Sequence, residues 1–192
     1  EEWRARAEAL AEEQGLVMVT PFNDHTIIAG QGTCGREIFE DLPDVDVIIV
    51  PIGGGSGVCG ACIVARALNP KVQVIGVQSE AAPAQYLSWK EGRVVEAPIR
   101  TVAEGLATGS GYADTLKIMT ELLDDFILVS EEEIARAIVL HLENTHNLAE
   151  HSGAASLAAA LKIKDSIRGK KVALVVSGGN ITLAQLRAAL AR

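Results

Sequence analysis

The chain has 192 residues and a formal net charge of −8, from 17 lysines and arginines against 25 aspartates and glutamates. This charge balance, without an extended basic run, argues against nucleic-acid binding, which needs a basic face to neutralise phosphates. Membrane insertion is not expected either, because no apolar run approaches about 18 residues.

The predicted elements alternate between helices and strands along the chain. In chain order, we expect a helix at residues 2–14, a short strand at 16–20, a loop at 22–29, a helix at 32–42, a strand at 45–52, a helix at 58–68, a strand at 72–77 and a helix at 81–90. An irregular stretch follows at 91–110, then a helix at 113–123, a strand at 126–129, a helix that a capping box at 130–133 opens and that runs to about 141, a helix at 149–164, a strand at 172–176 and a helix at 183–191.

Most of the predicted strands are continuous apolar runs rather than alternating patterns. Such runs are typical of a parallel sheet that is covered on both faces. We therefore predict an α/β fold: a doubly wound, mainly parallel sheet with helices on both faces, forming a single domain over residues 1–192. Ligands of such sheets bind beyond the carboxyl ends of the strands, so the loops at these ends are the candidate sites.

A glycine-rich loop connects the predicted strand at residues 45–52 to the following helix. The loop consists of Gly53, Gly54, Gly55, Ser56 and Gly57. Glycines let backbone N–H groups approach a phosphate closely, and the N-terminus of the next helix adds partial positive charge. The sequence therefore predicts a phosphate-bearing ligand at this loop.

A dinucleotide is one candidate for that ligand. Gly55, Gly57 and Gly60 satisfy the pattern G-x-G-x-x-G, and Glu80 lies 20 residues beyond Gly60, where a ribose-binding acid belongs. One alternative is therefore an NAD(P)-binding Rossmann domain. A nucleoside triphosphate is less favoured, because the Gly-Lys-Ser/Thr ending of a P-loop is missing.

A second candidate comes from a resemblance that covers nearly the whole chain. The segment PFNDHTIIAGQGTCGREIFEDLPDVDVIIVPIGGGSGVCG resembles the large domain of the serine/threonine dehydratases and serine racemases, fold-type II enzymes that use pyridoxal 5′-phosphate (PLP). The likeness continues in the expected order through VIGVQSEAAP, TVAEGLATGSG, AEHSGAASLAAAL and VVSGGN. Several separated motifs in register are more specific than one glycine loop.

The resemblance implies roles for eight residues. The loop from Gly53 to Gly57 corresponds to the segment that binds the PLP phosphate, with Ser56 as a further hydroxyl donor. Ser177 matches the residue that hydrogen-bonds the pyridine nitrogen, and a neutral hydroxyl there suits β-elimination. Gly105 matches a glycine beside the cofactor, and Glu150 matches an acid near its ring.

The implied activity is deamination of L-threonine or L-serine, in which the β-hydroxyl is eliminated and the product hydrolyses to a 2-oxo acid and ammonia. The implied partner is a small amino-acid substrate, and the full-length enzyme is expected to be a homo-oligomer. A serine racemase-like enzyme is an alternative on the same scaffold.

The catalytic lysine of such enzymes has no counterpart in this chain. PLP lyases hold the cofactor as a Schiff base on a lysine near the N-terminal end. None of the seven lysines stands in that sequence context: Lys71, Lys90, Lys117, Lys162, Lys164, Lys170 and Lys171. We therefore assign no catalytic residue and expect the chain to be the C-terminal part of a larger enzyme. A non-catalytic fragment or scaffold domain is an alternative.

A metal site is not expected. Many members of the resembled family bind a divalent cation through acids just after the strand that corresponds to residues 72–77. Here Gln78 and Ala84 stand at the places of two such acids, and Glu80 alone offers too few oxygen ligands.

The cysteines give a last expectation. Cys59 and Cys62 form C-x-x-C, which we interpret as small packing residues beneath the glycine loop rather than as a redox pair or half a zinc site. With Cys34 the count is odd, and no secretory feature is present. Reduced thiols and a cytoplasmic location follow.

Overall fold

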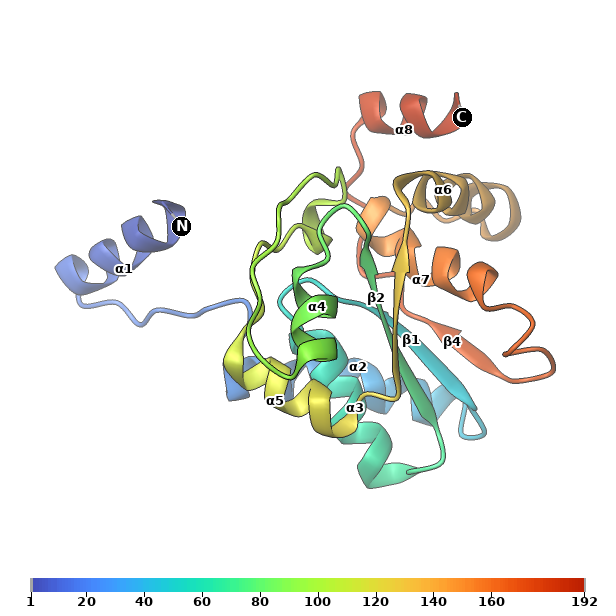
Figure 1. Cartoon of the computed structure of the whole chain (residues 1–192), viewed down its shortest axis with the longest axis horizontal. Coiled ribbons are helices and arrows are strands. Elements are labelled where there is room, and N and C mark those ends of the chain that lie inside the picture. The colour runs from blue at the N-terminus through green and yellow to red at the C-terminus, as the bar shows by residue number, and fades with distance from the viewer. Residues whose placement is uncertain (1, 192) are drawn as a thin grey trace.

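The structure, a computed structural model, describes residues 2–191 and contains a four-stranded sheet in the order β3-β2-β1-β4, with every pairing parallel (Figure 1). The strands are β1 (Val47–Pro51), β2 (Gln73–Ser79), β3 (Asp125–Val129) and β4 (Val172–Leu174). The helices are α1 (Glu2–Gln14), α2 (His25–Asp41), α3 (Ser56–Leu68), α4 (Ala84–Glu91), the 3₁₀ helix η1 (Glu104–Leu106), α5 (Ala113–Leu122), α6 (Glu131–Thr145), α7 (His151–Lys162) and α8 (Leu183–Leu190).

Helices cover both faces of the sheet, so the predicted doubly wound fold is confirmed. Because side chains alternate along a strand, β1 contributes to two separate cores. Val47 and Ile49 pack in the core formed with α6, α7 and α8. Ile48 and Val50 pack in the other core, which α2, α3, α4 and α5 complete. Both cores are well buried, as the continuous apolar runs predicted; the first is aliphatic, and the second also contains Phe39 and Phe126.

Helix α2 begins at His25, so the loop expected at residues 22–29 is wrong from that residue onward. Asp24 caps the helix by accepting hydrogen bonds from the amides of Thr26 and Ile27, at 2.7 and 3.1 Å. The glycines within α2 weaken its helical propensity but allow close packing on α3. A Cβ atom at Gly35 would lie 3.2 Å from the Cα of Ala61.

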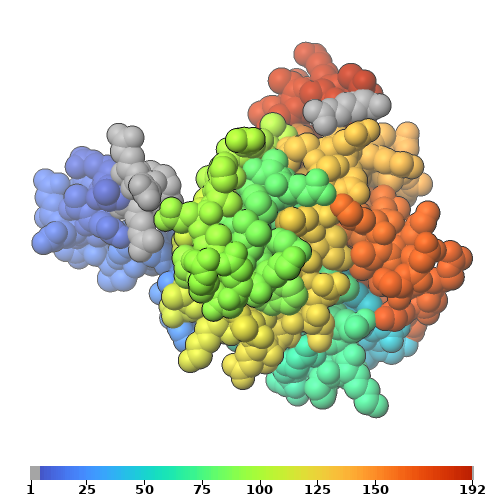
Figure 2. Space-filling model, in the orientation of Figure 1, coloured from blue at the N-terminus to red at the C-terminus, as the bar shows by residue number. Residues whose placement is uncertain are grey.

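The strand predicted at residues 16–20 is wrong. Leu16, Val17 and Val19 are 59%, 89% and 66% exposed, and within residues 2–191 no strand pairs with this segment. It runs outward from the molecule and carries α1, which stands apart from the sheet and its helices (Figures 1 and 2). A strand needs a neighbour for its backbone groups, and an apolar pattern alone cannot supply one.

The remaining predicted elements are present with small shifts at their ends. The capping box is confirmed, because Ser130 accepts a bond from the amide of Glu133 at 3.1 Å and the Glu133 carboxylate accepts one from the Ser130 amide at 2.7 Å. Strand β4 ends at Leu174, two residues earlier than predicted, and lies at an edge of the sheet. Among the helices formed by residues 2–191, none has the length and apolar character to cross a membrane.

Candidate functional site

Two loops leave the carboxyl edge of the sheet side by side. Strands β1 and β4 are parallel neighbours, and Ile49 pairs with Leu174. Ile52 and Ser177 each lie three residues beyond this pair, after β1 and β4 respectively. The glycine loop therefore begins beside Ser177, at the position where parallel sheets bind ligands.

The carbonyl groups of the glycine loop are held by the protein. The Gly53 carbonyl accepts hydrogen bonds from Gln85 Nε2 at 3.0 Å and from Thr108 Oγ1 at 3.5 Å. The Gly54 carbonyl accepts one from Thr115 Oγ1 at 3.0 Å. These side chains come from α4, from the segment before α5, and from α5 itself. Three separate parts of the chain thus fix the orientation of the loop peptides.

The amides of Gly54 and Gly55 point away from the carbonyl groups that the protein holds. In a trans peptide the N–H of one residue is directed away from the carbonyl of the residue before it, and the described residues contain no cis peptide bond. Within residues 2–191, no hydrogen bond is donated by the amides of residues 53–58, and α3 has no side-chain cap at its N-cap residue, Gly55. The loop therefore presents free N–H groups at a helix N-terminus, which attract an anion.

The backbone conformation explains why a serine is tolerated in this loop. Gly55 has φ +94°, whereas Ser56 lies outside the left-handed region. The Ser56 hydroxyl donates to the Pro21 carbonyl at 3.3 Å, so it ties the loop to the segment before α2. Its predicted role as a phosphate donor stays a prediction.

Helix α7 brings the other predicted residues to the same place. Its N-cap residue, Glu150, accepts a bond from the amide of Asn180 at 3.0 Å and donates its own amide to the Gly178 carbonyl at 3.1 Å. Ser152 Oγ accepts a bond from the amide of Gly105 at 2.9 Å. The Gly105 carbonyl in turn abuts Gly53, where a Cβ atom would overlap it.

The structure therefore joins all four predicted segments in one continuous patch. The glycine loop touches Gly105, Gly105 touches α7, and α7 holds the loop that follows Ser177. This juxtaposition is the result expected of a single ligand site, and the role of each residue in it remains a prediction.

Comparison with protein families is consistent with this geometry. A family model described as pyridoxal-phosphate dependent enzyme matches residues 1–178. The chain belongs to this family.

Two relatives from this PLP enzyme family are enzymes that are named for L-threonine. The L-threonine ammonia-lyase of Thermotoga maritima is 45% identical over 173 residues, which cover 90% of this chain and 43% of that protein. The catabolic L-threonine dehydratase of Escherichia coli K12 is 37% identical over 185 residues, 95% of this chain and 56% of that protein. The chain thus spans about half the length of the curated relatives it matches.

Solved structures show the same fold. The processed form of threonine deaminase isoform 2 from Solanum lycopersicum has a TM-score of 0.91 at 31% identity, covering 96% of this chain and 55% of that one. The serine racemase of Dictyostelium discoideum has a TM-score of 0.86 at 36% identity, covering 94% of this chain and 59% of that one.

The residues present fit PLP, the cofactor of this family. A phosphate dianion needs several N–H donors and room to approach them. The glycine loop offers the donors, because its amides are free in the described part of the chain. It is open at Gly57, where a Cβ atom would meet nothing closer than Gln31 Oε1 at 3.7 Å, whereas Gly53, Gly54 and Gly55 pack against Gly105, Phe22 and Thr115. Ser177 is exposed at the adjacent strand end.

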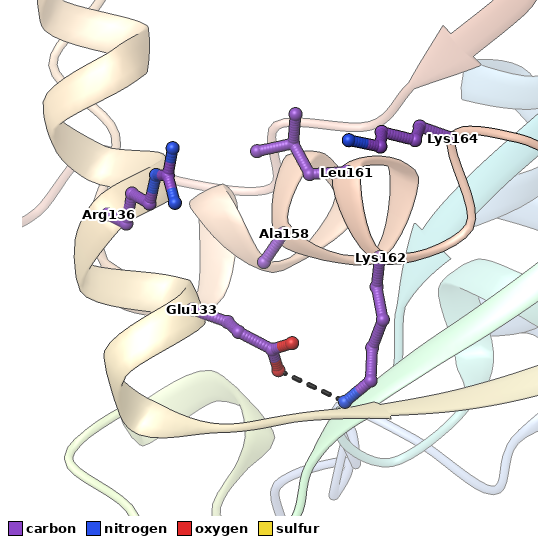
Figure 3. Close-up of a pocket in the computed structure, with 6 residues that line it drawn as sticks. All are labelled: Glu133, Arg136, Ala158, Leu161, Lys162 and Lys164. Atoms are coloured by element: carbon purple, nitrogen blue, oxygen red, sulfur yellow. Dashed lines mark hydrogen bonds and ion pairs between the residues drawn. The ribbon is translucent and has the colours of Figure 1, made fainter.

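Glu80, the acid of the dinucleotide alternative, is engaged elsewhere. Lys162 Nζ contacts the carboxylates of Glu80 and Glu133 at 3.2 and 3.1 Å and donates to the Leu128 carbonyl at 2.9 Å. Figure 3 shows the Lys162 amine turned toward Glu133, between α6 and α7. Helices α6 and α7 cover the face of the sheet opposite α3, so Glu80 belongs to an ion-pair cluster on that face. Because the chain belongs to the PLP enzyme family, the interpretation as an NAD(P)-binding Rossmann domain is wrong.

The cysteines of C-x-x-C pack under the loop as predicted. Cys59 and Cys62 are fully buried, and Cys59 Sγ contacts the Thr115 carbonyl at 3.4 Å. Burial raises the pKa of Cys62 to about 12 and raises that of Cys59 further. Both thiols therefore stay protonated at neutral pH, which does not suit a redox pair.

Gln78 is buried at the end of β2, where it donates to Thr108 Oγ1 at 3.1 Å and accepts from the amide of Tyr86 at 3.2 Å. Across the part of the chain that the structure describes, no three metal-ligating acidic, histidine or cysteine side chains come together. The absence of a metal remains a prediction.

Sequence reasoning missed the side chains that support the loop. Gln85, Thr108 and Thr115 hold its carbonyls, and the ring of Phe22 lies against Gly54. These four residues belong to segments that are distant in sequence, and each is a common residue type in an unremarkable local pattern. Only the tertiary contacts identify them.

Proposed function

We propose that this chain is the cofactor-binding part of a PLP-dependent ammonia-lyase that converts L-threonine or L-serine into a 2-oxo acid and ammonia. The observation that carries the proposal is the glycine loop, whose Gly53 and Gly54 carbonyls are held by the protein, whose amides donate no hydrogen bond within the described residues and which abuts Gly105. The threonine ammonia-lyases among the relatives support this substrate class.

The chain's residues have distinct roles in this proposal. The amides of residues 54–57 and the N-terminus of α3 hold the phosphate. Ser177 hydrogen-bonds the ring nitrogen without protonating it, since a hydroxyl is a far weaker acid than a carboxyl group. Gly105 lies beside the ring, where its lack of a side chain lets Ser152 pack against it, and Glu150 fixes the loop that carries Ser177. When bound, PLP supplies the electron-withdrawing ring that acidifies the α-proton of an amino acid.

The Schiff-base lysine is proposed to come from another part of the full-length enzyme. All seven lysines of this chain are exposed. Four of them have partners at other places: Lys90 lies over the Tyr86 ring, and Lys162, Lys170 and Lys171 contact Glu80, Gln73 and Asp44. We therefore propose that residues 1–192 form one α/β PLP-binding domain that binds the cofactor reversibly and does not catalyse by itself.

A titration followed by chemical trapping tests the proposal. We expect saturable PLP binding, detected by equilibrium dialysis and by the phosphorus NMR signal. Gly57→Asp should weaken it at least tenfold, because a carboxylate then occupies the phosphate position. Gly30→Asp is the matched control, since Gly30 lies on a helix with nothing within 4 Å of its Cβ position.

Borohydride reduction and peptide mapping then locate any Schiff base. We expect no pyridoxyl adduct on the seven lysines, and a specific adduct on one of them would contradict the assignment of the lysine to another segment. Absence of PLP binding would contradict the proposal itself. Conversion of L-serine mainly to D-serine by the full-length enzyme would favour the racemase alternative.

Two further expectations belong to this proposal. The three free cysteines are consistent with a cytoplasmic location, because disulfides are rare there. A homo-oligomer is expected of the full-length enzyme, and sedimentation of that enzyme would test it.

A further inference from the structure

A carboxylate outside the predicted site is hydrogen-bonded to the segment that carries Gly105. Glu131, the first residue of α6, accepts three hydrogen bonds. Its Oε1 accepts bonds from Ser79 Oγ at 2.6 Å and from Thr101 Oγ1 at 2.7 Å, and its Oε2 accepts one from the amide of Val102 at 2.9 Å. One side chain thus connects the end of β2, the start of α6 and residues 101–102.

Residues 101–106, which we call the strap, are held at both ends. Glu131 fixes the first two residues, and Thr101 Oγ1 also accepts a bond from the amide of Ala103 at 3.0 Å. At the other end Ser152 Oγ accepts a bond from the amide of Gly105 at 2.9 Å. The 3₁₀ turn Glu104–Leu106, which contains the second anchor, places the Gly105 carbonyl against Gly53.

The charge of Glu131 strengthens this attachment. Burial acts to raise the pKa of Glu131, but the bonds from Ser79, Val102 and Thr101 outweigh it, and the pKa lies below its usual value. The group is therefore ionised at neutral pH, and hydrogen bonds to an ionised acceptor are about twice as strong as neutral ones.

We infer that Glu131 is a positioning residue for the cofactor: by holding the strap, it places Gly105 against the glycine loop and so sets the affinity for PLP without touching it. The inference rests on the proposed function. Its neighbours have other roles, because Glu133 completes the capping box and Glu132 is exposed.

Glu131→Gln tests the inference in the whole chain. The amide keeps the size of the side chain but loses the charge, and its NH₂ group cannot accept a hydrogen bond. We expect PLP to bind at least fivefold more weakly and the amides of residues 101–106 to exchange hydrogen faster. Glu132→Gln, which makes the same change of net charge on an exposed neighbour, should stay within twofold of the wild type.

A second control separates positioning from general stability. Ser130→Ala removes the capping box of the same helix, so it should lower the melting temperature while leaving PLP affinity within twofold of the wild type. Glu131→Asp keeps the charge on a shorter side chain, and its expected loss of affinity is smaller than that of the Gln variant. This variant also keeps the test decisive if the Gln variant does not fold.

The outcomes distinguish the two proposals. If the wild type binds PLP and Glu131→Gln binds it equally well, the inference is wrong and the proposed function stands. If Ser130→Ala weakens PLP binding as much as Glu131→Gln does, the effect is a loss of stability and the inference is also wrong. If the wild type does not bind PLP, both fail.

Discussion

Gly55→Ala should destabilise the chain through a local conflict that the structure defines. Gly55 has φ +94°, a conformation that costs an L side chain roughly 1–2 kcal/mol. A Cβ atom there would also lie 2.9 Å from the Cβ of Thr115, and overpacking of this kind costs about 1–3 kcal/mol. Thr115 is held in place by the bond to Gly54, so it cannot move aside freely. We expect the free energy of unfolding to fall by roughly 2–5 kcal/mol.

Urea unfolding followed by circular dichroism measures this change. Gly57→Ala is the matched control in the same loop, because Gly57 is not in the left-handed region and its Cβ would meet no atom closer than 3.7 Å. That variant should be neutral or stabilise the chain by up to about 1 kcal/mol, as alanine does in helices. A loss below about 1 kcal/mol for Gly55→Ala, or equal losses in both variants, would refute the reasoning.

Other regions of the structure give three further predictions. Arg66→Met should lower the free energy of unfolding, measured by urea unfolding, by about 1.5–3 kcal/mol, because the guanidinium bonds the Asp124 carboxylate at 2.7 Å and three backbone carbonyls. The same change at exposed Arg36 should cost less than about 0.5 kcal/mol in this assay. His141→Leu should stabilise the chain by roughly 1 kcal/mol, because His141 Nε2 is buried without a partner among the described residues. Burial lowers the pKa of His141, so as the pH falls through 6.5 the unfolded state takes up a proton on this side chain before the folded state does. The free energy of unfolding should therefore fall less in the variant than in the wild type between pH 7.5 and pH 5. A thiol reagent should modify exposed Cys34 in the native chain and the two buried cysteines only after unfolding. Absorbance measures the number of thiols that react, and Cys34→Ser should abolish the reaction of the native chain.

The fold could be predicted wherever a local pattern determined the structure. The apolar runs of β1, β2 and β3 are buried on both faces, which is the condition that produces such runs. The start of α2 was missed because Thr26, Ile27, Ile28 and Gly30 have low helical propensity, and the burial of Ile28 in the core appears only in the structure. Residues 16–20 have the composition of a strand, but pairing depends on a partner that composition does not reveal.

Some residues of the candidate site could be predicted from a local pattern, and others could not. The glycine loop could be recognised because its chemistry lies in consecutive residues, and Ser177 because the resembled family has the motif VVSGGN at this place. The contacts of Gln85 and Thr115 could not, because a buried polar side chain has many possible partners and the sequence does not choose among them. The same is true of Glu131, whose three partners are 52, 30 and 29 residues away.

The exposed segment at residues 16–20 has a consequence for the behaviour of the chain in solution. Leu16, Val17 and Val19 present apolar side chains together with backbone groups that pair with no strand in the described part of the chain. An extended apolar segment of this kind is a template for strand pairing between molecules. Concentrated samples should therefore self-associate through it, and removal of residues 1–20 should keep them monodisperse, since the packed cores begin at α2.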